Sequence, residues 1–376
     1  AMMRDLIRRE AKRAMGSPAV LALIVGNELS PNHVYTIGLD QTESLLRLAA
    51  RSVKELDPAR LVSYANWPEL PFLDHSMLDV VSFNVYPYKP ANVSHSFGFR
   101  GYVEHLKRLQ ARDKPLLITE VGLSASPNTS SQSGYGGLTP EAQARQVLDV
   151  WDAVFQARAQ GACVFEWNDE WWKQGDRLDD ESAHDPDDPE EWFGMQEFAS
   201  ADPPTVTGEG AGQPVLVPRP LYHALKAYNQ AIVLSPIDEE RYHERVPVSV
   251  YTTDAVATVR VRVANAKWQS AAHLSPHWWK AALDVPTQEA PHRLDVTIQA
   301  LDLHRKVLVQ QVRRIWVGGT GVSSRVSIRT DQTRYEVGEQ LYPMPFTIRV
   351  EDERGQPTPN QLVHFAITEL PAHAEL

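Results

Sequence analysis

The chain has 376 residues, of which 43% are hydrophobic and 23% charged, so it is long enough for two or three globular domains with buried cores. Its 48 acidic residues outnumber its 37 basic residues by 11, which disfavours a general nucleic-acid or anionic-membrane binder. The single cysteine, Cys163, excludes an internal disulfide, and the longest apolar run, Ala19–Val25, is far shorter than the ~20 residues that a membrane span needs.

The first 235 or so residues alternate short apolar runs with amphipathic helical stretches. This order is typical of parallel strands joined by helical crossovers, and it predicts an α/β fold. Strands are expected at about 19–27, 61–65, 79–85, 115–120 and 162–167. Helices are expected at 5–15, 41–56, 102–112, 139–160 and 220–231. Thr139, followed by Pro140 and Glu141, is a typical helix start.

The pattern changes after about Pro236. Residues 246–263 and 285–317 alternate apolar and polar side chains, which predicts an all-β sandwich domain over 241–320. A glycine-rich linker, Gly318-Gly319-Thr320-Gly321, follows. Residues 326–368 then begin a second β pattern, so 321–376 is expected to be the start of a further β module.

An acidic stretch, Asp176–Glu191, holds nine carboxylates in sixteen residues. A solvated loop is the first interpretation. A calcium site is the second, because oxygen ligands are dense, although their spacing differs from the helix–loop–helix calcium pattern. A lid over a nearby site is the third.

Polar and aromatic side chains stand where four of the five predicted strands end. They are Asn27, Glu28, Asn84, Tyr86, Glu120, Glu166, Trp167 and Asn168. In a parallel α/β barrel all strands present their carboxyl ends to one face, so these groups are expected to converge. Glu28 and Glu120 come from separate strands. Two carboxylates facing each other across a pocket are what cleavage of a glycosidic bond requires.

Three segments resemble the clan A glycoside hydrolases, which are retaining enzymes built on a TIM-type (β/α)8 barrel. They are Gly26-Asn27-Glu28, Thr119-Glu120-Val121-Gly122 and the aromatic-rich run that ends at Trp167. In that clan the fourth strand ends in Asn-Glu, whose glutamate is the acid/base, and the seventh ends in the nucleophile. The resemblance covers residues 4–232 and implies that 1–240 is the C-terminal part of such a barrel, strands four to eight.

The resemblance also implies roles. Asn27 would bind the sugar 2-hydroxyl, Glu28 would be the acid/base, Glu120 the nucleophile, Tyr86 its hydrogen-bond partner and Trp167 the floor of the sugar subsite. The remaining predicted substrate contacts are Asn66, Trp67, Asn84 and Trp171. For each position the alternative is ordinary core packing or a solvated strand end. A retaining mechanism predicts a carboxyl separation of about 5 Å.

Strands one to three of such a barrel have no counterpart in this sequence. The favoured explanation is that the chain is a fragment of a longer protein. Completion of the barrel by a partner chain and a fold that has drifted from the barrel are the alternatives. The 241–320 module is expected to be immunoglobulin-like, and 321–376 to be a truncated module that resembles a bacterial immunoglobulin-like repeat.

The sequence therefore predicts a retaining glycoside hydrolase or transglycosylase acting on a β-linked poly- or oligosaccharide. The alternative is a non-catalytic carbohydrate-binding or cell-surface protein built on a degenerate barrel. No cofactor, metal, nucleic acid or membrane span is expected. An extracellular, periplasmic or cell-surface location is expected for either function.

Overall fold

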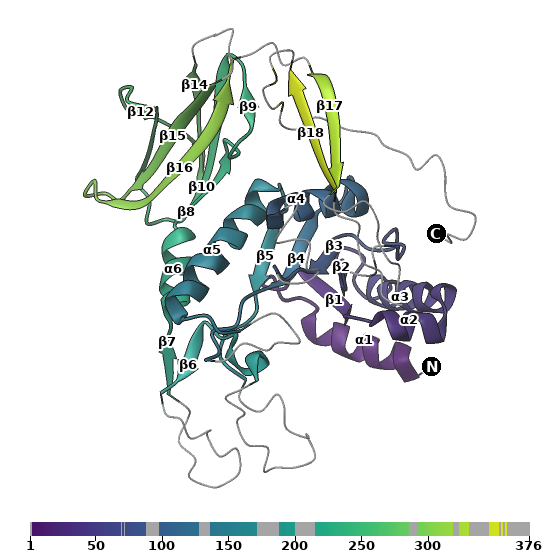
Figure 1. Ribbon diagram of the computed structural model, residues 1–376. Coiled ribbons are helices and arrows are strands. Elements are labelled where there is room, and N and C mark those ends of the chain that lie inside the picture. The colour runs from purple at the N-terminus through teal and green to yellow at the C-terminus, as the bar shows by residue number, and fades with distance from the viewer. Residues whose placement is uncertain are drawn as a thin grey trace. The chain divides into compact units, whose positions relative to one another are not determined.

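The computed structural model describes residues 2–68, 70, 72–87, 98–127, 136–170, 188–199, 215–285, 292–318, 323–330, 346–352, 355 and 358. The chain divides into two compact units, Ala1–Ile232 and Val233–Leu376. The described part of the first unit mixes helices and strands, and that of the second is built from strands (Figure 1).

The first unit contains five parallel strands that lie side by side in their order along the chain (Figure 1). These are β1 (Ala22–Asn27), β2 (Leu61–Asn66), β3 (Val81–Asn84), β4 (Leu116–Val121) and β5 (Gly161–Val164). The main helices are α1 (Met2–Ala14), α2 (Pro31–Ile37), α3 (Leu39–Lys54), α4 (Gly98–His105), α5 (Pro140–Gln156) and α6 (Pro220–Tyr228). Shorter elements are η2 (Leu106–Ala111), η3 (Pro189–Trp192), β6 (Gln196–Phe198) and β7 (Leu216–Pro218). Because the five strands are parallel, their carboxyl ends share one edge of the sheet.

Helices cover the sheet and complete its core. Helix α3 packs against β1 and β2, and α5 packs against β4 and β5. All four residues of β3 are buried, which explains why this stretch reads as an uninterrupted apolar run. One group of buried side chains surrounds β3, β4 and α5, and a second surrounds β2 and α3. The two groups hold the helices against the sheet.

Most predicted elements of this unit are present. The Thr139 hydroxyl accepts the Ala142 N–H at 3.2 Å and Pro140 is the first residue of α5, which confirms the predicted helix start. Helix α2 is an addition that was not predicted; it begins at Pro31, and the Ser30 hydroxyl before it accepts the His33 N–H at 3.3 Å. Strand β5 ends at Val164 rather than at 167. The last backbone hydrogen bond between this strand and β4 runs from the Phe165 N–H to Val121 O. The next N–H, of Glu166, donates to Phe193 O instead.

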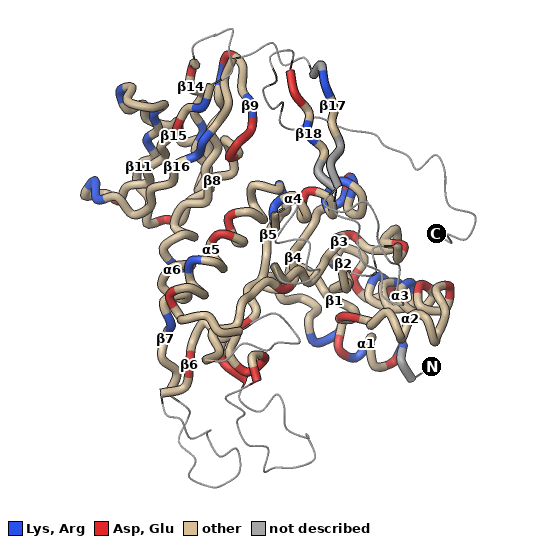
Figure 2. Tube along the Cα trace, in the orientation of Figure 1, with Lys and Arg blue, Asp and Glu red and all other residues tan. Residues whose placement is uncertain are grey.

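The described residues form a mixed α/β unit whose parallel sheet has five strands, and a closed eight-stranded barrel is not shown. Strand β1 lies at one end of this sheet. The side chains of Leu21 and Ile24 there are 76% and 49% exposed, and a pocket of about 440 Å³ lies between α1, β1 and α3. Charges of both signs are mixed along α1, whereas α3 has its acidic residues near its start and its basic residues toward its end (Figure 2). Arg4 and Arg8 of α1 both pair with Glu55.

The second unit contains two larger sheets that are mainly antiparallel. One has β8 (Ala231–Ser235), β10 (Arg245–Thr252), β13 (Ala272–Ser275) and β14 (Trp278–Asp284). The other has β9 (Arg241–Tyr242), β11 (Thr258–Val263), β12 (Gln269–Ser270), β15 (His292–Leu301) and β16 (Val307–Val317), with β9 parallel to β16. A separate pair joins β17 (Ser323–Thr330) to β18 (Phe346–Asp352). Alternate residues of β10 are buried, as its sequence pattern predicts.

No helix among the described residues is long and apolar enough to cross a membrane.

Candidate active site

Asn84, the last residue of β3, links Asn27 and Glu28 at the end of β1 to Thr119 of β4. Its side chain is 1% exposed. The Nδ2 atom donates to Asn27 Oδ1 at 3.0 Å and to Glu28 Oε1 at 2.9 Å, while Oδ1 accepts the Thr119 hydroxyl at 2.7 Å. These partners use both amide hydrogens and the carbonyl, so they fix the orientation of the amide. The carboxyl of Glu28, which directly follows β1, is thus tied to β3 and through Asn84 to β4.

Tyr86 contacts the second glutamate. Its hydroxyl donates to Glu120 Oε2 at 2.7 Å. Asn84 and Glu120 are paired in the β3–β4 ladder, and the Val85 N–H donates to Glu120 O at 2.9 Å. Asn84 is the last residue of β3, and Tyr86 follows it by two residues. One strand end thus supplies a hydrogen-bond donor to each of the two glutamates.

The chain around Glu28 is held tightly to β2. Glu28 has φ 45°, an uncommon conformation for a residue with a side chain. Its N–H donates to Ala65 O at 3.0 Å, and the next N–H, of Leu29, donates to the Tyr64 hydroxyl at 2.9 Å. Burial and the nearby Glu28 charge raise the pKa of Tyr64 to about 12, so the hydroxyl stays neutral. A Cβ atom at Gly26 would lie 3.3 Å from the Tyr64 ring, which favours glycine in Gly26-Asn27-Glu28.

Two phenylalanines that the sequence does not single out pack on Tyr86. The Phe193 and Phe165 rings meet Tyr86 edge-on, with centroids 5.9 and 6.1 Å away, and each other at 5.5 Å. A Cβ atom at Gly122 would overlap Phe165 O and crowd the Phe193 ring, so this glycine allows the close approach. Phe193 follows the acidic stretch by two residues, and nothing in its local sequence predicts the contact.

Asn66 and Trp67 are not brought to the two glutamates. The Asn66 side chain is fully buried. Its Nδ2 donates to Leu70 O at 2.9 Å and lies 3.2 Å from His75 Nε2, and its Oδ1 accepts the Trp67 N–H at 2.9 Å. All three contacts stabilise the turn after β2, so both the nitrogen and the oxygen of the Asn66 amide are used within this turn. Trp67 is half-buried and packs on the core around β2 and α3.

Trp167 lies against another element. It is 57% exposed, and its ring meets Tyr222 of α6 edge-on at 6.1 Å. The reason is that β5 ends early. The Glu166 N–H donates to Phe193 O, and Glu166 O accepts the Met195 N–H, so the backbone of Glu166 is bonded to residues 193–195 and not to β4. Phe165 rather than Trp167 is the β5-end aromatic that contacts Tyr86. Trp171 lies outside the described residues.

Cys163, on β5, lies near Glu120. Burial raises the pKa of its thiol, and the Glu120 charge raises it further. The side chain is nevertheless exposed. The thiol is therefore an accessible reporter of the charge on Glu120.

The acidic stretch 176–191 lies mostly outside the described residues, apart from 188–191. Asp188 caps η3 by accepting the Glu190 N–H at 2.9 Å, and Glu191 is fully buried. Among the described residues, no group of three or more histidine, cysteine, aspartate or glutamate side chains is arranged to hold a metal ion.

No protein-family model and no curated protein matches the chain. Similar solved structures include a β-glucuronidase of Bacteroides uniformis, with 15% identity and a TM-score of 0.44 over 84% of this chain. Others are a β-glucuronidase of Parabacteroides merdae, with 14% identity and a TM-score of 0.42 over 94%, and a Bacteroides fragilis protein assigned as a β-galactosidase, with 14% identity and 0.41 over 84%. The chain spans 36–44% of the length of these three proteins.

Proposed function

We propose that the chain carries the site of a retaining glycoside hydrolase or transglycosylase that acts on a β-linked poly- or oligosaccharide. Glu28 is the acid/base and Glu120 the nucleophile. The observation that carries the proposal is the shared strand end of β3, from which Asn84 donates to Glu28 and Tyr86 donates to Glu120. A pair of carboxyl groups held by separate donors at one sheet edge fits the two distinct roles that glycoside cleavage demands.

In the first step, protonated Glu28 gives its proton to the glycosidic oxygen while a carboxylate oxygen of Glu120 attacks the anomeric carbon. The bond from that carbon to the leaving oxygen breaks, and an ester to Glu120 forms. In the second step, Glu28 removes a proton from water, whose oxygen attacks the same carbon and releases Glu120. A sugar hydroxyl in place of water gives transglycosylation. Two inversions retain the anomeric configuration.

The surrounding residues support these roles physically. The Tyr86 hydroxyl donates to Glu120 Oε2, and a donor at this position favours the ionised carboxylate that the attack needs. The Asn84 amide contacts one Glu28 oxygen and is compatible with a proton on the other. Asn27, also bonded to Asn84, is exposed beside Glu28 and is the proposed contact for a sugar hydroxyl.

Turnover of a panel of 4-nitrophenyl β-glycosides, β-glucans, mannans and galactans tests the proposal. Glu120→Gln and Glu28→Gln are expected to lower kcat by at least ~10³-fold while sugar binding persists. A 2-deoxy-2-fluoro glycoside with a good leaving group is expected to label the peptide that holds Glu120, as read by mass spectrometry. Glu104→Gln, on α4, is the control and should keep full turnover.

Binding of a glycan without turnover by the wild-type chain would instead favour the carbohydrate-binding function. Full activity of Glu120→Gln would contradict the nucleophile assignment. Under either function we propose an extracellular, periplasmic or cell-surface location, because a polysaccharide partner is found there.

A further inference from the structure

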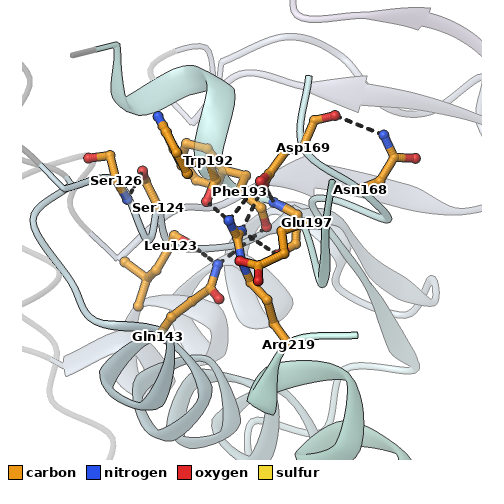
Figure 3. Close-up of polar contacts among 11 residues, drawn as sticks. Leu123, Ser124, Ser126, Gln143, Asn168, Asp169, Trp192, Phe193, Glu197 and Arg219 are labelled. Atoms are coloured by element: carbon orange, nitrogen blue, oxygen red, sulfur yellow. Dashed lines mark hydrogen bonds and ion pairs between the residues drawn. The ribbon is translucent and has the colours of Figure 1, made fainter. Parts of the chain in front are cut away.

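A buried ion pair joins the chain after β5 to the start of α6 (Figure 3). The Arg219 guanidinium bonds Asp169 through two parallel contacts, Nη1 to Oδ1 at 2.7 Å and Nη2 to Oδ2 at 2.6 Å. The two side chains are 2% and 0% exposed. Burial raises the pKa of Asp169 to about 6, against the opposing charge of Arg219, so the carboxyl is ionised at neutral pH. A planar fork of this kind holds both partners in one geometry.

The same two side chains clamp a third segment, residues 192–196. Arg219 Nη1 donates to Gly194 O at 3.0 Å, and the Gly194 N–H donates to Asp169 Oδ1 at 3.0 Å. Backbone bonds from Asp169 N to Gln196 O and from Arg219 N to Met195 O flank these contacts. A Cβ atom at Gly194 would overlap the backbone of Asp169 and Gln196, so the segment lies directly on the ion pair.

The clamped segment carries Phe193, whose ring contacts Tyr86. Phe193 is 1% exposed, and its carbonyl accepts the Glu166 N–H at 3.2 Å and Gln143 Nε2 at 3.4 Å. Its backbone is therefore fixed on both sides, and its ring cannot turn away without breaking a buried contact. The Tyr86 ring, bounded by Phe193 and Phe165, has its hydroxyl 2.7 Å from Glu120 Oε2.

We propose that the Asp169–Arg219 ion pair is a positioning element for the nucleophile. It holds Phe193 against Tyr86 and thereby keeps the Tyr86 hydroxyl on Glu120. The pair touches neither glutamate and acts only through this aromatic contact. The placement of Tyr86 stands on the geometry alone, whereas its effect on turnover rests on the proposed function.

A purely structural ion pair would stabilise the fold without governing Tyr86, and a matched pair in the same unit provides the comparison. Arg60 bonds Asp57 at 3.2 Å and also donates to the carbonyls of Ala14 and Val20. Its side chain and that of Asp57 are 12% and 23% exposed. Like Arg219, Arg60 joins an ion pair to backbone carbonyls, but its partners Ala14, Val20 and Asp57 precede β1 and β2, whereas Tyr86 follows β3.

The test replaces Tyr86 with 3-fluorotyrosine and reads its ¹⁹F resonance in full-length wild type and in the Arg219→Lys, Asp169→Asn, Phe193→Leu and Arg60→Lys variants. Arg219→Lys and Asp169→Asn are expected to shift or broaden the resonance. Phe193→Leu, which keeps the ion pair, is expected to do the same. Arg60→Lys is expected to lower the melting temperature and leave the resonance unchanged.

Kinetics of the same substitutions in the chain with its natural Tyr86 form the second readout. Arg219→Lys is expected to lower kcat about 10-fold with KM within about twofold, because misplacement of a reacting group affects the chemical step. An unchanged ¹⁹F resonance in folded Arg219→Lys and Phe193→Leu would overturn the proposal, as would an equal shift in Arg60→Lys. An inactive wild type would contradict the proposed function only, since the resonance still reports the placement of Tyr86.

Discussion

The amide nitrogen of Asn84 lies 2.9 Å from Glu28 Oε1, and the backbone of Asn84 pairs in register with Glu120 on the next strand. One asparagine thus fixes the carboxyl of Glu28, which follows β1, relative to the strand that carries the other glutamate. The first prediction follows from this relationship.

Asn84→Ala removes the donor to Glu28 and leaves the Thr119 hydroxyl without its acceptor. Glu28 gains negative charge as it gives up its proton in the transition state, and a hydrogen bond to a charged group contributes about 1.5–3 kcal/mol, so kcat/KM is expected to fall about 10- to 100-fold. Steady-state kinetics with the aryl glycoside that the wild type cleaves fastest measure this fall in kcat/KM. Ser63→Ala is the control, because Ser63 is also a buried strand residue with two polar contacts, to Val80 O and Ser82. An Asn84→Ala enzyme within twofold of wild type would refute the role.

The nearness of Cys163 to Glu120 gives a prediction that needs no substrate. Glu120→Gln removes the charge that raises the pKa of the thiol, while burial, the larger cause, remains. The pKa of Cys163 is therefore expected to fall, and because the thiolate is the reactive form, alkylation at pH 8 should become faster. The pH dependence of the iodoacetamide reaction, followed by mass spectrometry, measures the shift. Glu104→Gln should leave the alkylation rate unchanged. Equal rates in wild type, Glu120→Gln and Glu104→Gln would show that the charge on Glu120 does not affect the Cys163 thiol.

His75 predicts how the stability of the first unit depends on pH. Burial lowers the pKa of His75 from 6.5 to about 4. The Asn66 amide is oriented by Leu70 and Trp67, so its Nδ2 donates to Nε2, which must therefore be an unprotonated acceptor.

The unfolded chain binds a proton at His75 below pH 6.5, whereas the folded chain does so only below about 4. Stability is therefore lost as the pH falls through this window, by about 2 kcal/mol at pH 5 relative to pH 7.5. Urea unfolding at both pH values measures the loss. In His75→Gln the difference between the two pH values should shrink by about this amount, and a difference equal to that of wild type would show that His75 does not cause it.

Gly194→Ala tests the close packing around the ion pair. A Cβ atom there would overlap the backbone of Asp169 and Gln196, which cannot yield as a side-chain end can, so the free energy of unfolding is expected to fall by about 2–3 kcal/mol. Gly161→Ala is the matched control, since its Cβ would make an ordinary 3.4 Å contact with a Leu117 methyl group and should change stability by less than about 1 kcal/mol. Thermal unfolding compares the two variants.

Local patterns in the sequence were enough to predict the five parallel strands, one helix start and four residues at the strand ends. Apolar runs marked the five parallel strands, Thr139 and Pro140 marked the start of α5, and strand ends marked Glu28, Asn84, Tyr86 and Glu120 as neighbours. These features are predictable because they depend on residues close in the chain: the burial of a whole strand, a cap on its own helix, and the common edge of parallel strands.

Only the tertiary structure decided which side chains meet there. Asn66 ends β2 much as Asn84 ends β3, yet one turns into its own loop toward His75 and the other bonds Glu28. Residues 193–195 draw the chain out of the sheet after Val164, so that Phe165 contacts Tyr86 and Trp167 lies on Tyr222. Phe193 is 107 residues from Tyr86 in the sequence. Contacts between such distant segments depend on how loops pack after the strands end, and the period of a strand carries no information beyond its last residue.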